Sequence, residues 1–135
     1  MRAVTVTGLS TSPLSAATIS GSLVHTSGQV GRVRGTGELA PDFEAQMRAA
    51  LANLDIVLEA AGSSRGQVLK TVVFLTRRED LDAMNRVYAE HFGEPWPARS
   101  TIVCALAHEA LLFEIEAVAE CAATPSPPPG AAPAP

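Results

Sequence analysis

Residues 67–92 read QVLKTVVFLTRREDLDAMNRVYAEHF and contain two different hydrophobic patterns in succession. The first, at 67–76, is rich in β-branched residues and apolar throughout its centre, which is typical of a central β-strand. From Asp80 to Phe92 the apolar residues instead recur every three or four positions, which predicts an amphipathic helix. Gly93 and Pro95 then end that helix, because neither residue continues it well. A strand followed by a helix therefore forms the centre of the predicted fold.

The region before this centre contains another helix and a pair of short strands. Between residues 42 and 62 apolar residues repeat at helical spacing, with Asp42 suited to cap the first turn and Gly62 the last. Residues 32–41 hold two glycines and a proline, so we expect a loop there. Residues 18–30 contain two short β-branched runs separated by a Ser-Gly pair, which is typical of a hairpin or meander.

Two further strand-like runs, 99–106 and 111–121, follow the centre, and the short segment between them predicts an antiparallel hairpin. The resulting order, ββ-α-β-α-ββ, indicates an α+β fold whose mixed sheet carries two helices on one face. Since there is no third helix for the other face, we expect another subunit to cover it. We expect one domain over residues 1–121, followed by a disordered Pro/Ala-rich tail over 122–135.

Composition and charge exclude several classes of function. The formal net charge is -4 and basic residues occur only as short pairs such as Arg32 and Arg34, so a nucleic-acid partner is not expected. The three histidines are dispersed, and Cys104 and Cys121 lie in separate apolar runs, which predicts neither a metal site nor a disulfide. No stretch approaches the roughly 20 apolar residues that cross a bilayer, and no apolar leader is present, so we expect a cytoplasmic protein without membrane contact.

Arg99 lies in a predicted strand, where its alternation partners are Thr101, Val103 and Ala105. An arginine in such apolar surroundings requires an anionic partner to offset its desolvation. Two interpretations remain open at this stage. The guanidinium either forms an ion pair within the protein or binds the carboxylate of a substrate through two parallel hydrogen bonds.

Glutamates alternate with apolar residues in the last predicted strand, so Glu114, Glu116 and Glu120 share one face. They form either a solvent-facing polar edge or a site in which one partly buried carboxyl has a raised pKa and works as an acid or base. Spacing does not choose among the three. In the predicted hairpin Arg99 lies opposite residues near Val118, away from Glu114. A pocket that uses both side chains then requires another register or a neighbouring subunit.

Four segments of the chain, in this order, resemble the RidA family, the reactive intermediate deaminases also called the YjgF family: SLVHTSGQVG at 22–31, QVLKTVVFLT at 67–76, WPARSTIV at 96–103 and FEIEAVAE at 113–120. The similarity covers the chain except its Pro/Ala-rich tail, and the pairing of PARS with EIEA is fairly specific. The resemblance implies a chorismate-mutase-like fold and a homotrimer with three clefts between subunits. It also implies hydrolysis of 2-enamino or 2-imino acids to 2-oxo acids with release of ammonia, without a cofactor.

The resemblance also implies roles for individual residues. Arg99 matches the arginine that holds the substrate carboxylate, and Glu114 matches the glutamate that positions or activates water. Ser27 and Gly28 match the Thr-Ser-Gly corner of the substrate pocket. Thr101 stands where a cysteine often follows the arginine-serine pair, so we expect it among the substrate contacts.

Two other departures from the family pattern concern Leu14 and the turn at residues 106–108. Leu14 follows Pro13 where the family usually has a tyrosine, and the arginine of the usual RLP turn is missing. Leu14 makes the pocket more apolar, so we expect a bulkier or less polar substrate that keeps its carboxylate, within a catabolic or biosynthetic pathway. The alternatives are a non-catalytic trimer that binds a small carboxylate as a sensor or regulator, and a ribonuclease, against which the acidic charge counts.

Overall fold

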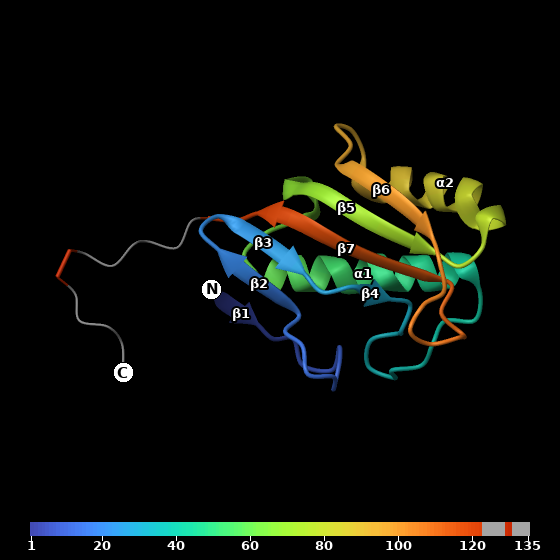
Figure 1. The fold of residues 1–135 in the computed structure, drawn as a ribbon, viewed down its shortest axis with the longest axis horizontal. Coiled ribbons are helices and arrows are strands. Elements are labelled where there is room, and N and C mark those ends of the chain that lie inside the picture. The colour runs from blue at the N-terminus through green and yellow to red at the C-terminus, as the bar shows by residue number, and fades with distance from the viewer. Residues whose placement is uncertain (123–128, 131–135) are drawn as a thin grey trace.

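The computed structural model describes residues 1–122 and 129–130, which begin with four strands and continue as helix, strand, helix and two final strands (Figure 1). The strands are β1 (Arg2–Val4), β2 (Ala17–Ser20), β3 (Leu23–Thr26), β4 (Gln29–Val30), β5 (Val68–Leu75), β6 (Ala98–Val103) and β7 (Phe113–Glu120). The helices are α1 (Phe43–Ala60) and α2 (Leu81–Phe92), with single 3-10 turns at Arg65–Gln67 and Arg78–Asp80. The α+β class and the positions of both helices are confirmed. Of the tail predicted over 122–135, residues 123–128 and 131–135 lie outside the described residues.

One mixed sheet contains all seven strands, in the order β1-β2-β3-β7-β5-β6, with β4 paired to β7 beside β3. Both helices lie on the same face of this sheet, as predicted (Figure 1). The core fills the space between the two layers, because alternate residues of each strand point toward the helices. Its largest buried side chains are Phe113, Met47, Leu51, Leu54, Leu58, Leu75, Met84 and Ile115.

The predicted C-terminal hairpin is wrong, because β6 and β7 do not pair with each other. Strand β5 lies between them, parallel to β6 and antiparallel to β7, so that Thr71 faces Arg99 on one side and Ala117 on the other. The reason is that β5, α2 and β6 form a strand-helix-strand unit, whose helical crossover returns the chain in the same direction. Strand β6 is therefore the edge of the sheet. The three-residue strand β1 was not predicted either.

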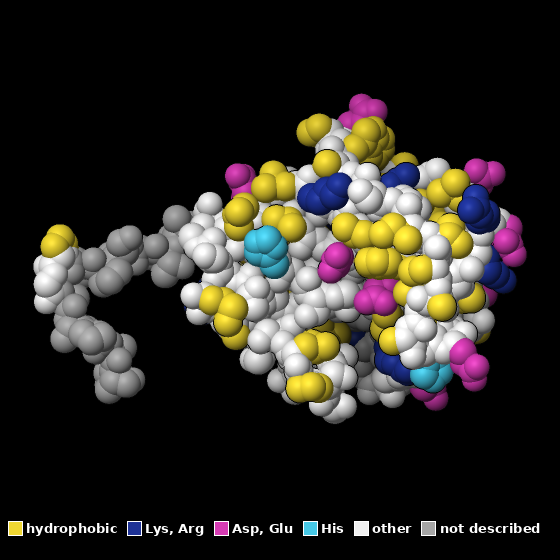
Figure 2. All heavy atoms as spheres, viewed as in Figure 1, with side chains coloured by type: hydrophobic (Ala, Val, Ile, Leu, Met, Phe, Trp, Pro, Cys, Tyr) yellow, Lys and Arg dark blue, Asp and Glu magenta, His cyan; other side chains and the backbone are white. Residues whose placement is uncertain are grey.

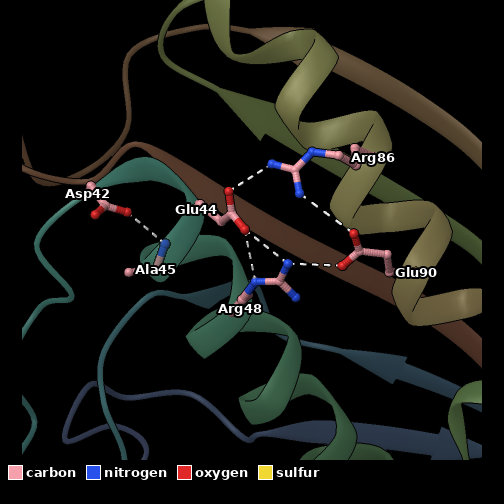
Figure 3. A network of polar contacts seen from close by, with 6 residues as sticks. All are labelled: Asp42, Glu44, Ala45, Arg48, Arg86 and Glu90. Atoms are coloured by element: carbon pink, nitrogen blue, oxygen red, sulfur yellow. Dashed lines mark hydrogen bonds and ion pairs between the residues drawn. The ribbon is translucent and has the colours of Figure 1, made fainter.

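Helix α1 begins where the sequence predicts, and it is joined to α2 by an exposed charge network (Figure 3). The side chain of Asp42 accepts a hydrogen bond of 2.9 Å from the backbone N–H of Ala45, which caps the first turn. The carboxylates of Glu44 and Glu90 bind the guanidinium groups of Arg48 and Arg86 across the two helices. These side chains are 42–53% exposed, so their contribution to stability is small and screened by salt.

The face of the sheet opposite the helices is uncovered. Figure 2 looks onto this face and shows hydrophobic side chains gathered over its middle, with acidic side chains set among them. Ile102 of the edge strand is 43% exposed there, while Glu114 and Glu116 of β7 are half-buried. Within the described residues, no helix is long and apolar enough to pass through a membrane.

Candidate active site

Glu114 pairs with Val30 of β4, close to the point where the partner of β7 changes from β3 to β4. The pairing with β3 ends at His25 and Val118, and the pairing with β4 resumes at Gln29 and Ile115. Between these two ladders the N–H of Ala117 lacks a strand partner, and the hydroxyl of Thr26 accepts its hydrogen bond at 3.0 Å. The chain therefore bulges at residues 27–28, directly beside the carboxyl group of Glu114.

The absence of a side chain at Gly28 lets the carboxyl group of Glu114 lie against the bulge. A Cβ atom on residue 28 would lie 1.9 Å from Oε1 and 2.9 Å from Cδ of Glu114, far inside any allowed contact. Burial, together with the negative charge of Glu116, raises the pKa of the Glu114 carboxyl above its ordinary value. A partly buried carboxyl group with a raised pKa is a candidate acid or base.

Ser27 precedes Gly28 at the bulge and is hydrogen-bonded to the segment that carries Leu14. The hydroxyl of Ser27 donates a 2.6 Å hydrogen bond to the carbonyl oxygen of Ser15, which fixes the segment that carries Leu14. Leu14 is 52% exposed. Together with Gly28, Leu14 lines a cavity of about 280 Å³, whose wall also includes Gln29 and Asn53. Gly28 therefore lies both in the wall of the cavity that Leu14 lines and against the carboxyl group of Glu114, which is not part of that wall.

Arg99 lies at the far edge of the sheet, where its guanidinium group is held by neutral partners. Its Nη2 donates a 2.8 Å hydrogen bond to Oδ1 of Asn85, and its Nη1 lies 3.7 Å from Sδ of Met84. The guanidinium carbon also lies 4.8 Å from the centre of the Tyr88 ring, a cation-π contact. Among the residues described, no carboxylate forms an ion pair with Arg99, so the internal ion pair considered from the sequence is not found.

A cavity of about 380 Å³ opens beside Arg99, lined also by Asn85, Tyr88, Ala89, Trp96 and Pro97. The sequence did not predict that Asn85 and Tyr88 hold the arginine. The available signal was their spacing of three residues on α2, which places both side chains on one face of the helix. The hydroxyl of Tyr88 lies 2.7 Å from that of Thr71, and this buried hydrogen bond fixes the ring under the guanidinium.

Thr101 is separated from the other predicted substrate contacts. It lies two residues beyond Arg99 on the same strand and lines a different cavity, of about 210 Å³, with Leu75, Leu81 and Val103. In one protomer, the residue that replaces the family cysteine therefore shares an edge strand with Arg99 but not its cavity.

Arg99 and Glu114 point to opposite faces of the sheet. Arg99 pairs with Thr71, which is fully buried and contacts Tyr88 of α2, so the arginine side chain lies on the helix side. Glu114 pairs with Phe74, which lies three positions after Thr71 on β5. Because successive side chains of a strand point to opposite faces, the side chain of Glu114 lies on the open side of the sheet. Within this chain the two groups are therefore separate: Arg99, which forms no ion pair with a carboxylate of the described residues, and Glu114, whose carboxyl pKa is raised. Over the part of the chain that the structure describes, no group of three or more His, Cys, Asp or Glu residues could hold a metal ion.

Comparison with known proteins gives consistent matches over most of the chain. The family model described as Endoribonuclease L-PSP matches residues 7–121. A RutC family protein of Pyrococcus horikoshii, PH0854, is 40% identical over 108 residues, which are 79% of this chain and 86% of that protein. The 2-iminobutanoate/2-iminopropanoate deaminase of Salmonella typhimurium is 39% identical over 73% of this chain and 80% of its own length.

Solved structures show the same fold. RidA from the Antarctic bacterium Psychrobacter superposes with a TM-score of 0.84 at 30% identity, covering 89% of this chain and 99% of that one. The crystal structure of Escherichia coli TdcF with bound serine superposes with a TM-score of 0.81 at 30% identity, covering 89% and 98%.

Proposed function

This chain belongs to the RidA family, whose family model carries the description Endoribonuclease L-PSP. We propose that it hydrolyses a reactive 2-enamino or 2-imino acid to the 2-oxo acid and ammonia. The observation that carries the proposal is the state of Arg99. Its guanidinium faces a cavity of about 380 Å³ and contacts neutral partners, with no carboxylate among the described residues. Such a group is suited to bind the carboxylate of an incoming substrate through two parallel hydrogen bonds.

Glu114 is the proposed base. Its raised pKa makes the ionised carboxylate more basic than that of an exposed glutamate, so it takes a proton more readily from a bound water molecule. The water oxygen bonds to the imine carbon, and the proton taken from water passes from Glu114 to the imine nitrogen, which gives an aminoalcohol. The hydroxyl group of the aminoalcohol then loses its proton and forms the carbonyl group while the carbon-nitrogen bond breaks. The nitrogen takes up that proton and leaves as ammonia, and the 2-oxo acid remains. A 2-enamino acid reaches the same route by tautomerising to the imine.

A homotrimer would bring Arg99 of one protomer and Glu114 of the next together. In one protomer they lie on opposite faces of the sheet, with Arg99 on the edge strand and Glu114 on the uncovered face. A closed ring of three protomers, each setting its β6 edge against the open face of the next, would form three clefts that each contain both groups. The same contact would cover the exposed apolar residues of the open face, such as Ile102.

Proximity supplies most of the acceleration in such a cleft. Arg99 orients the substrate by its carboxylate, and Glu114 beside the backbone of Gly28 holds the water near the imine carbon. Every chemical step proposed here uses side chains and water alone, so we propose that no cofactor takes part. Ser27, Gly28 and Leu14 form the corner against which the substrate rests, and Thr101 of the neighbouring edge lies near it. Since Leu14 is apolar and half exposed at this corner, we propose a substrate less polar than a small amino-acid imine.

A second candidate function is the binding of a small carboxylate without turnover. It is favoured by the crystal structure of the Escherichia coli relative TdcF, which contains bound serine. The two functions differ in the role of Glu114. If Glu114→Gln abolishes hydrolysis and leaves the affinity for a 2-oxo acid intact, the chain is an enzyme. If the wild-type protein binds 2-oxo acids and hydrolyses no imine, it is a binding protein.

The test uses imines made in place by an amino-acid oxidase, with semicarbazide to trap the imine that escapes hydrolysis. We expect the purified protein to suppress semicarbazone formation and Arg99→Ala to lose this effect. Arg2→Ala, which removes an exposed arginine from the opposite edge strand, is the matched control and should keep full activity. Full activity in Arg99→Ala would refute the proposed carboxylate anchor. Cleavage of RNA by the wild-type protein, weakened by added salt, would instead support a ribonuclease.

A further inference from the structure

The cavity beside Arg99 has an aromatic wall that the proposed chemistry does not use. Trp96, the single tryptophan of the chain, lines this cavity and is 49% exposed. An aromatic side chain buries roughly 150–250 Å² when it is covered, so covering the exposed part of this indole is favourable. An indole left half open beside a guanidinium group whose described partners are all neutral marks a surface that can take a ligand with both an acid group and an apolar part.

The other aromatic ring of the cavity is already occupied. The face of Tyr88 carries the guanidinium of Arg99 at 4.8 Å, and its hydroxyl is hydrogen-bonded to Thr71. The ring pairs found in the described part of the chain are Phe43 with Phe113, and Phe92 with both Tyr88 and His91. Trp96 belongs to none of them, and about half of its surface is exposed to a ligand.

The remaining lining of the cavity is mixed. Ala89 and Pro97 carry no polar side-chain atoms, whereas Asn85 accepts a hydrogen bond from Arg99 through Oδ1 and has its amide nitrogen as a donor. The selectivity expected here therefore comes from the indole and not from the exclusion of polar groups. A flat apolar group would lose little and would gain the stacking surface of the indole.

From these contacts we propose that Trp96 determines specificity, and that the preferred substrates are 2-imino acids with an aromatic side chain. This inference rests on the proposed function: Arg99 holds the carboxylate while the substrate ring packs on the indole of Trp96. The cavity volume of about 380 Å³ is within the range of 300–1,000 Å³ usual for small-molecule sites. A substitution that removes the indole of Trp96 should therefore remove the preference for aromatic substrates.

Turnover is compared on the imines that D-amino-acid oxidase makes from D-phenylalanine and D-alanine. We expect kcat/KM to be at least about tenfold higher for the phenylalanine-derived imine. Trp96→Ala should lower that value about tenfold, mainly through KM, and leave the alanine-derived imine almost unchanged. Trp96→Phe should keep most of the preference. Leu81→Ala, which removes an apolar side chain that is 41% exposed in the neighbouring cavity, is the matched control.

Calorimetric titration with phenylpyruvate and pyruvate, the corresponding 2-oxo acids, separates this inference from the proposed function. We expect phenylpyruvate to bind at least about tenfold more tightly, and Trp96→Ala to remove the difference. Equal affinities in the wild-type protein, or an equal loss for both acids in Trp96→Ala, would overturn the role of Trp96. If no imine is hydrolysed while the calorimetric preference is present and depends on Trp96, the proposed hydrolysis fails and the aromatic specificity stands.

Discussion

Replacing Gly28 by alanine would place a methyl group where the carboxyl of Glu114 now lies. The new Cβ would be 1.9 Å from Oε1, and an ordinary contact begins at 3.4 Å, so the carboxyl must move by about 1.5 Å. The obstructing atoms are the far end of a flexible side chain, which can rotate away. The backbone at Gly28 is not in the left-handed region, so alanine adds no strain there.

The expected result of Gly28→Ala is a loss of activity without a loss of stability. A displacement of about 1 Å at a reacting group can lower a rate about 100-fold, so we expect kcat to fall at least that much. The free energy of unfolding should change by less than about 1 kcal/mol, because a glycine to alanine change at an unstrained position alters mainly the unfolded chain. The carboxyl would also become more exposed, so the acidic limb of the pH profile should shift to lower pH.

The assay combines imine hydrolysis as a function of pH with urea unfolding of the same preparations. Gly66→Ala is the matched control, because its Cβ would meet only Oγ of Ser64, at 3.9 Å, and its backbone is likewise outside the left-handed region. That variant should keep the wild-type rate. Wild-type kcat in a stably folded Gly28→Ala protein would refute the reasoning, since the Glu114 carboxyl could then not act from its observed place.

Three further changes test other parts of the structure. The pKa of Glu114 is raised above its unfolded value of 4.5, so the contribution of this carboxyl group to stability is fully present below pH 4.5 and is lost as the pH rises through the folded pKa. Glu114→Gln should therefore raise the Tm at pH 7 and leave the Tm unchanged below pH 4.5. Asn85→Ala removes the acceptor that orients Arg99 and should raise KM roughly tenfold with kcat unchanged in steady-state assays, whereas an unchanged KM would show that Asn85 does not position the arginine. Asp42→Ala should lower the free energy of unfolding in urea by about 1 kcal/mol without altering activity, and a larger loss would contradict a simple capping role.

Periodicity alone predicted the long elements of the fold. The helices expected at 42–62 and 80–92 and the strand expected at 67–76 were observed at Phe43–Ala60, Leu81–Phe92 and Val68–Leu75. Both helices bury one face and β5 buries most of an apolar run. The spacing of hydrophobic residues in these segments therefore follows which residues are buried. Strand β1 has only three residues, too few for a pattern to be read.

Strand pairing could not be predicted from the short link expected between the last two strands. The predicted link was 107–110, a length that usually joins the strands of a hairpin, whereas the observed connection covers 104–112 and β5 lies between the two strands. The better guide was the strand-helix-strand order of β5, α2 and β6, which favours parallel pairing through the crossover rule. Pairing between strands distant in sequence depends on the packing of the whole sheet.

The candidate site was predictable in its residue types and not in its geometry. An arginine in an apolar strand and glutamates at alternate positions are visible in the sequence, whereas the neutral partners Asn85 and Tyr88 come from the packing of α2 on the sheet edge. The fit of Glu114 over Gly28 depends on a bulge between β3 and β4, which no local pattern indicates. The separation of Arg99 from Glu114 was expected, and the structure adds that they face opposite sides of the sheet.

Mixed assembly of two inactive variants tests most directly whether Arg99 and Glu114 of different protomers share one pocket. Arg99→Ala and Glu114→Gln are each expected to be inactive alone. When they are co-expressed in equal amounts, about one quarter of the clefts in a ring of three should receive the intact arginine from one protomer and the intact glutamate from the next. We predict recovery of about a quarter of the wild-type activity. Activity that stays at the level of the single variants in assemblies shown to contain both chains would contradict a shared pocket.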